Sequence, residues 1–270
     1  NMLGRTPGNV VAMHPLKDGV ISDHEMTVRM LQELFRTATK AGIFTPKPRV
    51  VICVPSGVTE VEERTVINAA IEAGARRVYL IEEPLAAGLG AGLDIKGPKG
   101  HMVVDIGGGT TDVAVLTLNG VATSSSTEAA GDAFDEAIAR HVRRQYGVVI
   151  GQVTAEDIKI KIGSAYPYEG EGAIDVKGRN LVDGLPKNIE VTSEEVREAL
   201  ADSVNQILDA IRTTLEKTPP ELAADIIDQG IMLTGGGALL RGLDRLISAE
   251  TKMPVHVAEN PLDCVVDGTG

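Results

Sequence analysis

Short apolar runs along the chain alternate with helix-like stretches, and this alternation predicts an α/β protein. Residues 49–55 are almost continuously apolar, as in the buried strands of parallel sheets. A helix should follow, because Thr59 and Glu62 fit a capping box and Gly74 marks a helix end. Residues 78–81 form the next apolar run. We therefore predict a parallel strand–helix–strand unit with a right-handed crossover.

Residues 103–115 are typical of two strands joined by a glycine turn. Val103 and Val104 are β-branched and suit a buried strand. The turn contains Gly107, Gly108 and Gly109. Glycines let the backbone turn sharply and approach a ligand closely, and the N–H groups of this turn, with the hydroxyls of Thr110 and Thr111, suit phosphate oxygens. A plain β-hairpin with a loose turn is the alternative.

Residues 231–240 repeat this pattern, since an apolar strand again ends at glycines. The second turn contains Gly235, Gly236 and Gly237, followed by Ala238. An amphipathic helix directly after it is predicted by the spacing of Leu239, Leu240, Leu243, Leu246 and Ile247. A glycine turn at a helix N-terminus favours an anion. We expect the two turns to grip one nucleotide from two sides, and the sequence contains neither a P-loop nor a Rossmann motif.

Carboxylates stand at the ends of two predicted strands. Asp105 faces the same point as the first glycine turn and suits Mg²⁺ held through water. Glu82 and Glu83 follow the strand at 78–81, and ligands sit at the carboxyl ends of parallel strands. Glu83 either orients a water for attack on a γ-phosphate or caps the helix that starts near Pro84. The residues by themselves leave both interpretations open.

Between about residues 153 and 192 the sequence pattern changes to a short helix followed by a hairpin-like region, which suggests a small inserted subdomain. A short helix there carries Glu156 and Lys159 one turn apart on the same face. The simple interpretation is a solvent-exposed ion pair, worth less than about 1 kcal/mol. A hairpin should follow, with its turn at residues 177–180.

The composition is that of a soluble globular protein and argues against a nucleic-acid partner. Of the 270 residues, 43% are apolar and 24% are charged, which allows a sizeable core. Aromatic residues make up only 3%, and 38 acidic against 26 basic side chains give a net charge of −12, so nucleic-acid binding is disfavoured. No apolar run reaches the roughly 18 residues of a membrane span. Cys53 and Cys264 lie in apolar, strand-like contexts, and we expect two buried thiols in a reducing cytoplasm.

Several of these motifs resemble those of a known superfamily, the actin and heat-shock chaperone ATPases. Residues 105–112 resemble its second phosphate motif, residues 234–238 its adenosine motif, and residues 81–87 its connecting segment. Within that superfamily, the chain closely resembles the MreB family of bacterial actins, which determine rod shape. The phrases that carry this closer resemblance are residues 1–9, 17–21 and 162–167.

The resemblance implies an actin-like ATPase fold with two ribonuclease-H-like halves, each carrying a smaller subdomain. The first half would span residues 1–96, and residues 97–270 would form the second half, with the insertion at about 153–192. We expect the chain to be truncated at both ends, because the first phosphate loop of the family and its closing helix are missing from this sequence. Asp267 stands where the family has an aliphatic residue. Because a carboxylate is costly to bury, this end is either exposed or imperfectly recorded in the sequence.

The resemblance also implies ATP and Mg²⁺ as ligands, and hydrolysis of the γ-phosphate by water. Glu83 and Thr110 would position that water, Asp105 would hold the metal, and the first glycine turn would grip phosphate. Glu156 and Lys159 would hold the adenosine together with the second turn. Asp132, which follows Gly131, is a weaker candidate.

As a member of this family, the protein would be cytoplasmic and would form filaments with itself on the inner membrane surface. Ile43 and Phe44 are bulky apolar residues in a predicted loop, and by themselves they could tuck back into the core. The resemblance implies instead an apolar membrane-inserting loop at this place. The cell-wall elongation machinery would be the partner, and peptidoglycan synthesis the process that the filament organises. A small-molecule kinase and a chaperone-type ATPase of the same superfamily are the alternatives.

Overall fold

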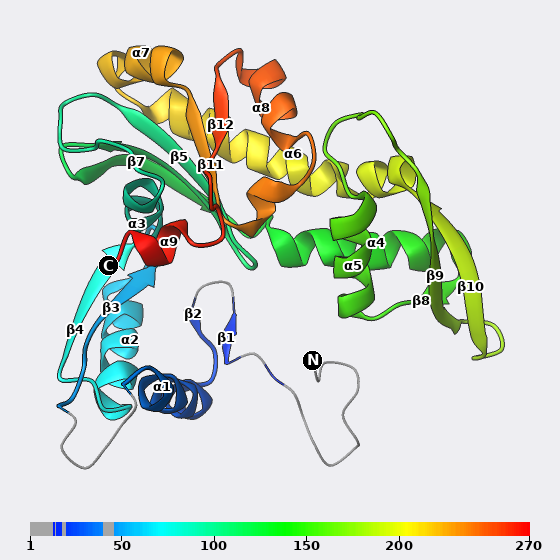
Figure 1. Ribbon diagram of the computed structural model, residues 1–270, viewed down its shortest axis with the longest axis horizontal. Coiled ribbons are helices and arrows are strands. Elements are labelled where there is room, and N and C mark those ends of the chain that lie inside the picture. Colours follow the sequence, from blue (N-terminus) through cyan, green and yellow to red (C-terminus); the bar gives the residue numbers. More distant parts are fainter. Residues whose placement is uncertain (1–12, 14, 18–19, 40–45) are drawn as a thin grey trace.

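The computed structural model describes residue 13 and residues 15–17, 20–39 and 46–270. The predicted membrane contact at Ile43 and Phe44 lies outside these residues, as does the phrase at residues 1–9. Figure 1 shows the residues from about 20 to 90, in blue and cyan, below a five-stranded sheet, and a yellow-green hairpin at the far right of the molecule.

The described part of the first 96 residues contains β1 (Leu16–Lys17), β2 (Val20–Ile21), α1 (His24–Thr39), β3 (Arg49–Val54), α2 (Glu60–Glu72), β4 (Arg77–Glu82) and α3 (Glu83–Gly90). β3 and β4 pair in parallel on either side of α2, which confirms the predicted strand–helix–strand unit. The capping box of α2 is also confirmed, because the backbone N–H of Glu62 donates to Thr59 Oγ1 and the N–H of Thr59 donates to the Glu62 carboxylate.

β3 is less buried than its apolar sequence predicts. Val51 and Tyr79 lie opposite each other in the register, and they are 43% and 48% exposed. Within the described residues this sheet has two strands, so one of its faces is open at this pair. The prediction of a strand buried on both faces is therefore wrong for the chain as described.

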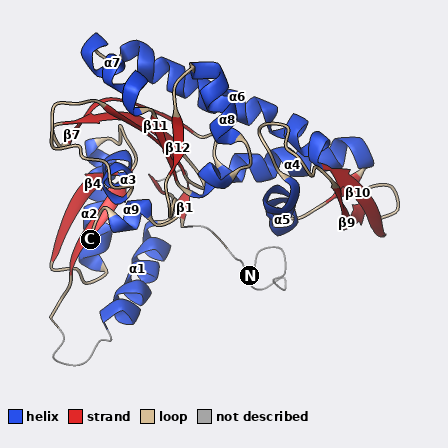
Figure 2. Cartoon of the chain, turned by 45° about the horizontal axis from the view of Figure 1, so that its top comes forward, coloured by secondary structure: helices blue, strands red, loops and turns tan. Residues whose placement is uncertain are grey.

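The rest of the chain builds a larger sheet. Its strands are β5 (His101–Ile106), β6 (Thr111–Thr117), β7 (Gly120–Thr127), β11 (Ile231–Thr234) and β12 (Val255–Val257), in the order β12-β11-β5-β6-β7. β5, β6 and β7 are antiparallel, whereas β11 is parallel to β5 and β12. The helices that accompany it are α4 (Gly131–Tyr146), α6 (Ser193–Lys217), α7 (Pro220–Gln229) and α8 (Leu243–Thr251). Figure 2 shows the long α6 beside this sheet.

Both faces of the five-stranded sheet are covered, and the side chains of β5 alternate between two cores. Val104 and Ile106 belong to the larger core, to which α4, α6 and α8 contribute. Val103 belongs to a smaller core that includes Ala87 of α3. This period of two follows from the strand geometry, in which neighbouring side chains point to opposite faces. The sheet therefore joins the two parts of the chain.

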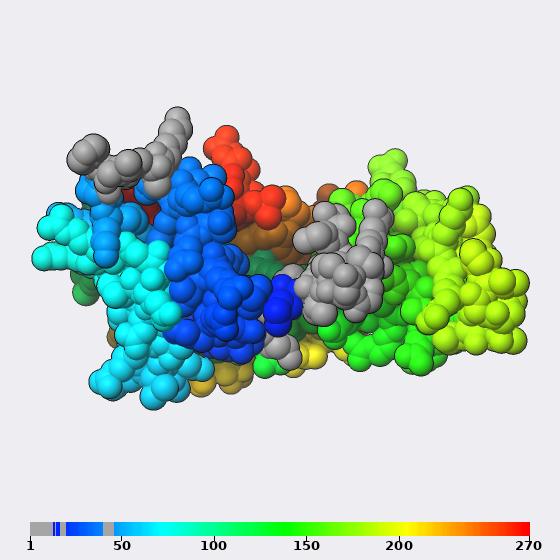
Figure 3. Space-filling model, turned by 90° about the horizontal axis from the view of Figure 1, so that it is seen from below, coloured from blue at the N-terminus to red at the C-terminus, as the bar shows by residue number. Residues whose placement is uncertain are grey.

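A smaller sheet lies near the opposite end of the molecule. It contains β10 (Pro186–Thr192), β9 (Ala173–Asn180) and β8 (Val148–Val149), and α5 (Gln152–Ile162) comes between β8 and β9 in the chain. In the view from below, this green and yellow-green region forms one end, and the blue and cyan residues occupy the other (Figure 3). β8 precedes the range of about 153–192 that we predict for the inserted subdomain.

The predicted hairpin turn at residues 177–180 is wrong, because β9 continues through Asn180 and the turn follows at residues 181–185. The sequence around Gly178 suggests a turn, but this glycine lies within β9. A Cβ atom at this position would overlap Val148 of the neighbouring strand. The glycine therefore permits close strand packing rather than a turn.

The turn between β6 and β7 offers a test of local strain. Leu118 and Asn119 have φ values of 49° and 58°, so both adopt the left-handed conformation, which is unfavourable for leucine. Leu118 is 65% exposed and loses little packing when it is replaced. We expect Leu118→Asn to raise the free energy of unfolding by about 0.5–1 kcal/mol in urea titrations. Leu118→Ala is the control, since it keeps the strain, and an equal gain from it would contradict the explanation.

The chain returns near residue 264 to pack against α3. The short helix α9 (Cys264–Asp267) crosses α3 with direct contact between the two backbones (Figure 1). A Cβ atom at Gly90 would overlap the carbonyl oxygen of Cys264, and one at Gly268 would overlap the carbonyl oxygen of Ala86. The Asp267 carboxylate is exposed, which agrees with the first of the two alternatives for this end of the chain.

Both cysteines are free, and each departs in one respect from its prediction. Cys264 is buried as expected, but it begins α9 and does not lie in a strand. Cys53 lies on β3 as expected, but it is only half-buried. Burial raises the pKa of the Cys53 thiol to about 11, with smaller contributions from the negative charges of Glu83 and Asp105.

Candidate functional site

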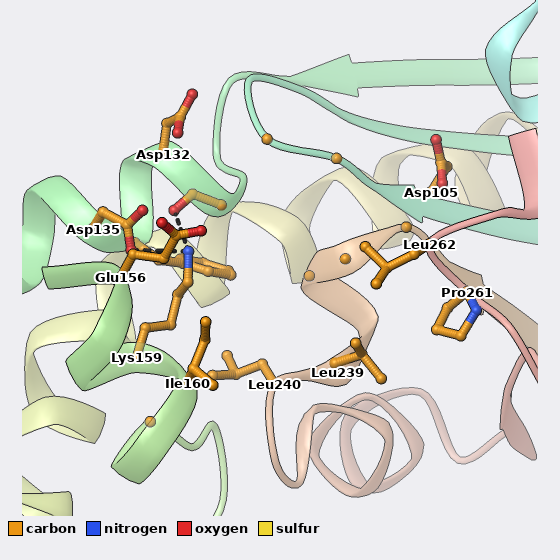
Figure 4. A pocket seen from close by; sticks show the side chains of 18 of the residues that line it. Asp105, Asp132, Asp135, Glu156, Lys159, Ile160, Leu239, Leu240, Pro261 and Leu262 are labelled. Atoms are coloured by element: carbon orange, nitrogen blue, oxygen red, sulfur yellow. Dashed lines mark hydrogen bonds and ion pairs between the residues drawn. The ribbon is translucent and has the colours of Figure 1, made fainter. Parts of the chain in front are cut away.

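A cavity of about 670 Å³ lies between the two glycine turns. Residues from α4, α5 and the segment after β12 complete it (Figure 4). The predicted site residues that line it are Asp105, Gly107, Gly108, Glu156, Lys159, Gly235, Gly236 and Gly237. The weaker candidate Asp132 lines it as well. Five other predicted residues are not part of the lining, namely Glu83, Gly109, Thr110, Thr111 and Ala238.

The second glycine turn packs against the end of β5, directly before the first glycine turn, although the two are far apart in sequence. β5 and β11 pair in parallel, so that Asp105 lies opposite Thr234. Gly235 has a φ of 77°, and a Cβ atom there would overlap the backbone of Ile106. Gly237 is held equally close to the side chain of Ile106. Glycine is therefore required by the sheet geometry as well as by any ligand.

The first glycine turn also supports the start of α4. The N–H of Gly131 donates to the carbonyl oxygen of Gly107 at 3.0 Å, and the N–H of Asp132 donates to that of Gly108 at 2.8 Å. Within the turn, the N–H of Gly107 donates to the carbonyl oxygen of Thr110 at 2.9 Å. These hydrogen bonds fix the shape of the turn and the direction in which α4 leaves it.

The helix that we predict directly after the second glycine turn is interrupted. Residues Gly236–Leu239 form a short 3₁₀ turn, η1, and α8 begins only at Leu243. Gly242 separates them with a φ of 72°, which a continuous α-helix does not allow. The leucine spacing fits one helix, but the backbone is already extended at Leu240, where ψ is 121°, and Leu239 and Leu240 line the cavity instead.

Three carboxylates, those of Asp105 on β5, Glu83 on α3 and Asp112 on β6, lie near the end of the cavity that the first glycine turn lines. Thr234 Oγ1 donates to Asp105 Oδ1 at 2.8 Å, and burial raises the pKa of Asp105 to about 6. The pKa of Glu83 rises to about 7 through burial and through the negative charges of Asp112 and Asp105. Burial also raises the pKa of Asp112, opposed by the hydrogen bond from the Ser56 N–H. Among the described residues, however, no three acidic, histidine or cysteine side chains are grouped closely enough to hold a metal ion directly.

Glu83 is the first residue of α3, and Glu82 occupies the N-cap position. Glu82 makes no capping hydrogen bond through its side chain and accepts one from Ser56 Oγ at 3.2 Å. Within the described part of the chain, no hydrogen bond reaches the Glu83 carboxylate. Nothing here supports the interpretation of Glu83 as a helix cap, and its carboxylate is half-buried near the other two acids.

At the other end of the cavity, Lys159 pairs with Asp135 rather than with Glu156. The Nζ atom of Lys159 lies 2.8 Å from Asp135 Oδ1 and donates to the carbonyl oxygen of Gly131 at 3.0 Å (Figure 4). The side chains of Lys159 and Asp135 are only 18% and 4% exposed. The solvent-exposed ion pair with Glu156 is therefore wrong, and Lys159 instead ties α5 to α4.

We expect Lys159→Met to lower the free energy of unfolding by about 2–3 kcal/mol near pH 7, because it leaves a buried carboxylate unpaired. Burial raises the pKa of Asp135 above 3.8, and Lys159 opposes that rise. Without Lys159 the pKa of Asp135 rises further, so the loss should shrink as the pH falls and this carboxylate takes up a proton. Urea titrations at pH 5 and pH 8 test this, with the exposed Lys161→Met as the matched control. A loss that does not depend on pH would contradict it.

Sequence reasoning missed the apolar part of the cavity. Ile160, Leu239 and Leu262 are 62%, 57% and 69% exposed, and all three line it. The missed lining residues are Phe134, Asp135, Ile160, Gly163, Leu239, Leu240, Arg241, Pro261, Leu262 and Val265. A helix pattern gives no sign that Leu239 and Leu240 face a ligand cavity. Pro261 and Leu262 follow the last strand, where an apolar residue in a loop was the available signal.

A five-stranded sheet covered on both faces, with a cavity between two glycine turns, is the architecture of an actin-like α/β protein. The crystal structure of MreB5 of Spiroplasma citri bound to ADP superposes with a TM-score of 0.94 at 41% identity, covering 99% of this chain and 80% of that one. The MamK double helical filament superposes with a TM-score of 0.81 over 95% of this chain and 79% of that one; at 23% identity this shows a likeness of fold alone.

The chain belongs to the MreB/Mbl protein family, whose family model matches residues 1–270. It is 53% identical over 269 residues to the cell shape-determining protein Mbl of Bacillus subtilis (strain 168), covering 100% of this chain and 80% of the relative. It is 54% identical to the cell shape-determining protein MreB of Escherichia coli (strain K12), covering 100% of this chain and 78% of the relative. None of the described helices combines the length and the apolar character that crossing a bilayer requires.

Proposed function

We propose that the protein binds and hydrolyses ATP and assembles into filaments on the inner face of the bacterial plasma membrane. There it organises peptidoglycan synthesis with the cell-wall elongation machinery and so determines rod shape. The observation that carries the proposal is the cavity between the two glycine turns, with carboxylates at one end and apolar side chains at the other. Support comes from the MreB5 structures bound to ADP and AMPPNP and from the named role of the relatives in cell shape.

The two ends of the cavity suit the two ends of ATP. Its volume of about 670 Å³ falls within the usual range for small-molecule sites. The glycine turns would take the phosphates, because Gly108, Gly236 and Gly237 line the cavity and have no side chains that obstruct the approach. The base would lie against Ile160, Leu239 and Leu240, with Glu156 and Lys159 beside the ribose. The role of each of these residues is part of the proposal.

Asp105 is proposed to hold Mg²⁺ through water. Mg²⁺ in nucleotide sites is bound by one or two carboxylates and by phosphates, and it keeps several waters. The residues fit this role, because Asp105 lines the cavity and its pKa of about 6 reflects buried negative charge that a cation would compensate. When bound, Mg²⁺ supplies neutralisation of the charge that develops on the phosphates.

For hydrolysis, Glu83 and Thr110 are proposed to position the attacking water. A general base needs a carboxylate that is ionised near neutral pH and free to accept a proton. The pKa of Glu83 is about 7, and no hydrogen bond occupies its carboxylate within the described residues. Thr110 closes the first glycine turn, where its carbonyl oxygen accepts a hydrogen bond from the N–H of Gly107. Both residues lie outside the cavity lining, so water would reach them beyond the terminal phosphate.

Electron microscopy of the full-length protein on a lipid monolayer, with and without ATP and Mg²⁺, tests the proposal. We expect membrane-bound filaments only when ATP and Mg²⁺ are present, together with release of inorganic phosphate. Hydrolysis without filaments would contradict the filament role and favour a kinase that uses water as a poor acceptor. Failure to bind ATP at all would contradict the proposal as a whole.

The proposed membrane contact is tested by Ile43→Ser together with Phe44→Ser. Two apolar side chains contribute roughly 3–5 kcal/mol when fully buried, which is weak for one subunit but strong when a filament repeats it. We expect the double variant to form filaments in solution and to lose co-sedimentation with liposomes. Leu118→Asn removes an exposed apolar side chain elsewhere and should bind like the wild type. Unchanged binding by the double variant would contradict the proposed contact.

A further inference from the structure

Arg241 lies in the loop between η1 and α8 and reaches across to the end of α5. Its Nη1 atom donates to the carbonyl oxygen of Ile160 at 3.0 Å and to that of Gly163 at 3.3 Å. These carbonyls belong to the last turn of α5 and its C-cap, where the helix dipole attracts a cation. The guanidinium also lies over the ring of Tyr168, 5.7 Å from its centroid. One side chain therefore fastens the end of α5 and the segment that follows it.

The backbone next to this side chain makes the same connection. The N–H of Ala165 donates to the carbonyl oxygen of Arg241 at 2.8 Å, and Ser164 forms an isolated parallel bridge with Arg241. Gly242 follows with a φ of 72°, and a Cβ atom there would press on Tyr166. The loop after η1 and the segment after α5 are thus in direct contact, and Arg241 is the residue through which side-chain and backbone contacts both pass.

These contacts lie beside the apolar end of the cavity. Arg241 itself lines the cavity, together with Ile160 from α5 and Leu240 from the loop. Figure 4 shows the side chains of Ile160 and Leu240 next to each other, where α5 meets the loop. The distance between α5 and the loop therefore sets the width of this end, and Arg241 bonds to the backbone of one of the residues that define it.

We propose that Arg241 is a positioning residue that fixes the width of the base end of the cavity by holding α5 against the loop after the second glycine turn. The inference rests on the proposed nucleotide binding and adds a residue that acts on one end of the ligand only. Lys159 and Glu156 lie on the same helix, so Arg241 also sets where their side chains stand.

The phosphate end does not depend on Arg241. The two glycine turns are held together by the pairing of β5 with β11 and by the packing of Gly235 and Gly237 on Ile106. The loss of Arg241 should therefore weaken contacts with the base and leave the grip on a phosphate chain unchanged. A residue that only supported folding would affect both ends alike.

The test compares ATP with inorganic tripolyphosphate, each with Mg²⁺, by titration calorimetry on the full-length protein. We expect Arg241→Ala to weaken ATP binding about tenfold, as for a lost pair of charge-assisted hydrogen bonds, and to change the tripolyphosphate Kd by less than about twofold. Arg241→Lys keeps a cation at the end of α5 without the planar fork, and its ATP Kd should lie between those of the wild type and Arg241→Ala.

Arg245→Ala is the matched control. Arg245 lies on α8 one turn further along, its side chain is exposed, and within the described residues it has no hydrogen bond or ion pair. Arg245→Ala removes the same charge but no contact with α5, so the ATP Kd of this variant should equal that of the wild type. Hydrogen exchange at residues 160–168 should become faster in Arg241→Ala and stay unchanged in Arg245→Ala.

An equal loss of both ligands in Arg241→Ala, or no loss of ATP binding, would overturn the proposal. If Arg241→Ala does not fold, Arg241→Lys decides, since a lower ATP affinity at constant tripolyphosphate affinity is expected there too. Wild-type protein that binds tripolyphosphate and ATP equally well would show that the base end contributes nothing, and it would also overturn the proposal. Wild-type protein that binds neither ligand would contradict the proposed function itself.

Discussion

Glu83→Gln should lower ATP hydrolysis about a hundredfold to a thousandfold and leave ATP binding and filament formation within about threefold of the wild type. A general base or water-positioning carboxylate contributes on this scale, and glutamine keeps the shape of the side chain while losing the ability to accept a proton. Phosphate release measures the first effect, and fluorescent-nucleotide titration and electron microscopy measure the others. Because Glu83 lies outside the cavity lining, this substitution should affect hydrolysis without affecting nucleotide binding.

Glu82→Gln is the matched control, since it removes the neighbouring carboxylate, which accepts a hydrogen bond from Ser56. Its hydrolysis rate should stay within about threefold of the wild type. A second readout comes from linkage, because the pKa of Glu83 rises from 4.5 to about 7 on folding. Folding then favours the protonated form, so the part of the stability that Glu83 controls falls as the pH rises from about 4.5 to about 7. Glu83→Gln should lack that part of the pH dependence, and wild-type hydrolysis by this variant would rule out the proposed role.

Gly90→Ala should destabilise the folded protein by about 3 kcal/mol or more. The new methyl group would overlap the carbonyl oxygen of Cys264 in α9, and neither helix backbone can move far without disturbing the sheet that both cover. The expected result is a lower urea midpoint with an unchanged slope. Because α3 and α9 belong to different parts of the chain, we also expect weaker ATP binding in the full-length protein.

Gly97→Ala is the control for this substitution. A Cβ atom at Gly97 meets nothing within 4 Å, and the residue does not require a positive φ. Its free energy of unfolding should change by less than about 0.5 kcal/mol. Equal stability of Gly90→Ala and Gly97→Ala would show that the crossing of α3 and α9 can separate at little cost.

The parts of the fold that the sequence predicts are those determined by local patterns. The capping box at Thr59, the parallel pair formed by β3 and β4, and the strands on either side of the first glycine turn all follow from residues close together in the chain. The break before α8 does not follow from the leucine spacing, because the extended backbone at Leu240 and the left-handed conformation of Gly242 interrupt the helix. Gly178 suggests a turn where the chain forms a strand. The glycine is required there because Val148 of the neighbouring strand lies too close for a Cβ atom.

The sequence predicts the polar residues at one end of the candidate site, but not its buried ion pair or its apolar end. The glycine turns and Asp105 carry their own signals, and the structure brings them together around one cavity. The partner of Lys159 was missed, because Asp135 lies on another helix and only the packing of α4 against α5 brings the two together. The apolar end was missed for the same reason, since exposure of Ile160 and Leu262 depends on which elements surround them.

The crossing of α3 and α9 has a consequence for the order of events during synthesis. Gly90 leaves the ribosome roughly 170 residues before Cys264, which at about 5–20 residues per second is an interval of roughly 10–35 seconds. During that time α3 lacks the partner that covers Gly90. The nascent chain therefore exposes an unfinished helix surface until Cys264 has been synthesised, and a chaperone that binds such surfaces would have most of its opportunity in this interval.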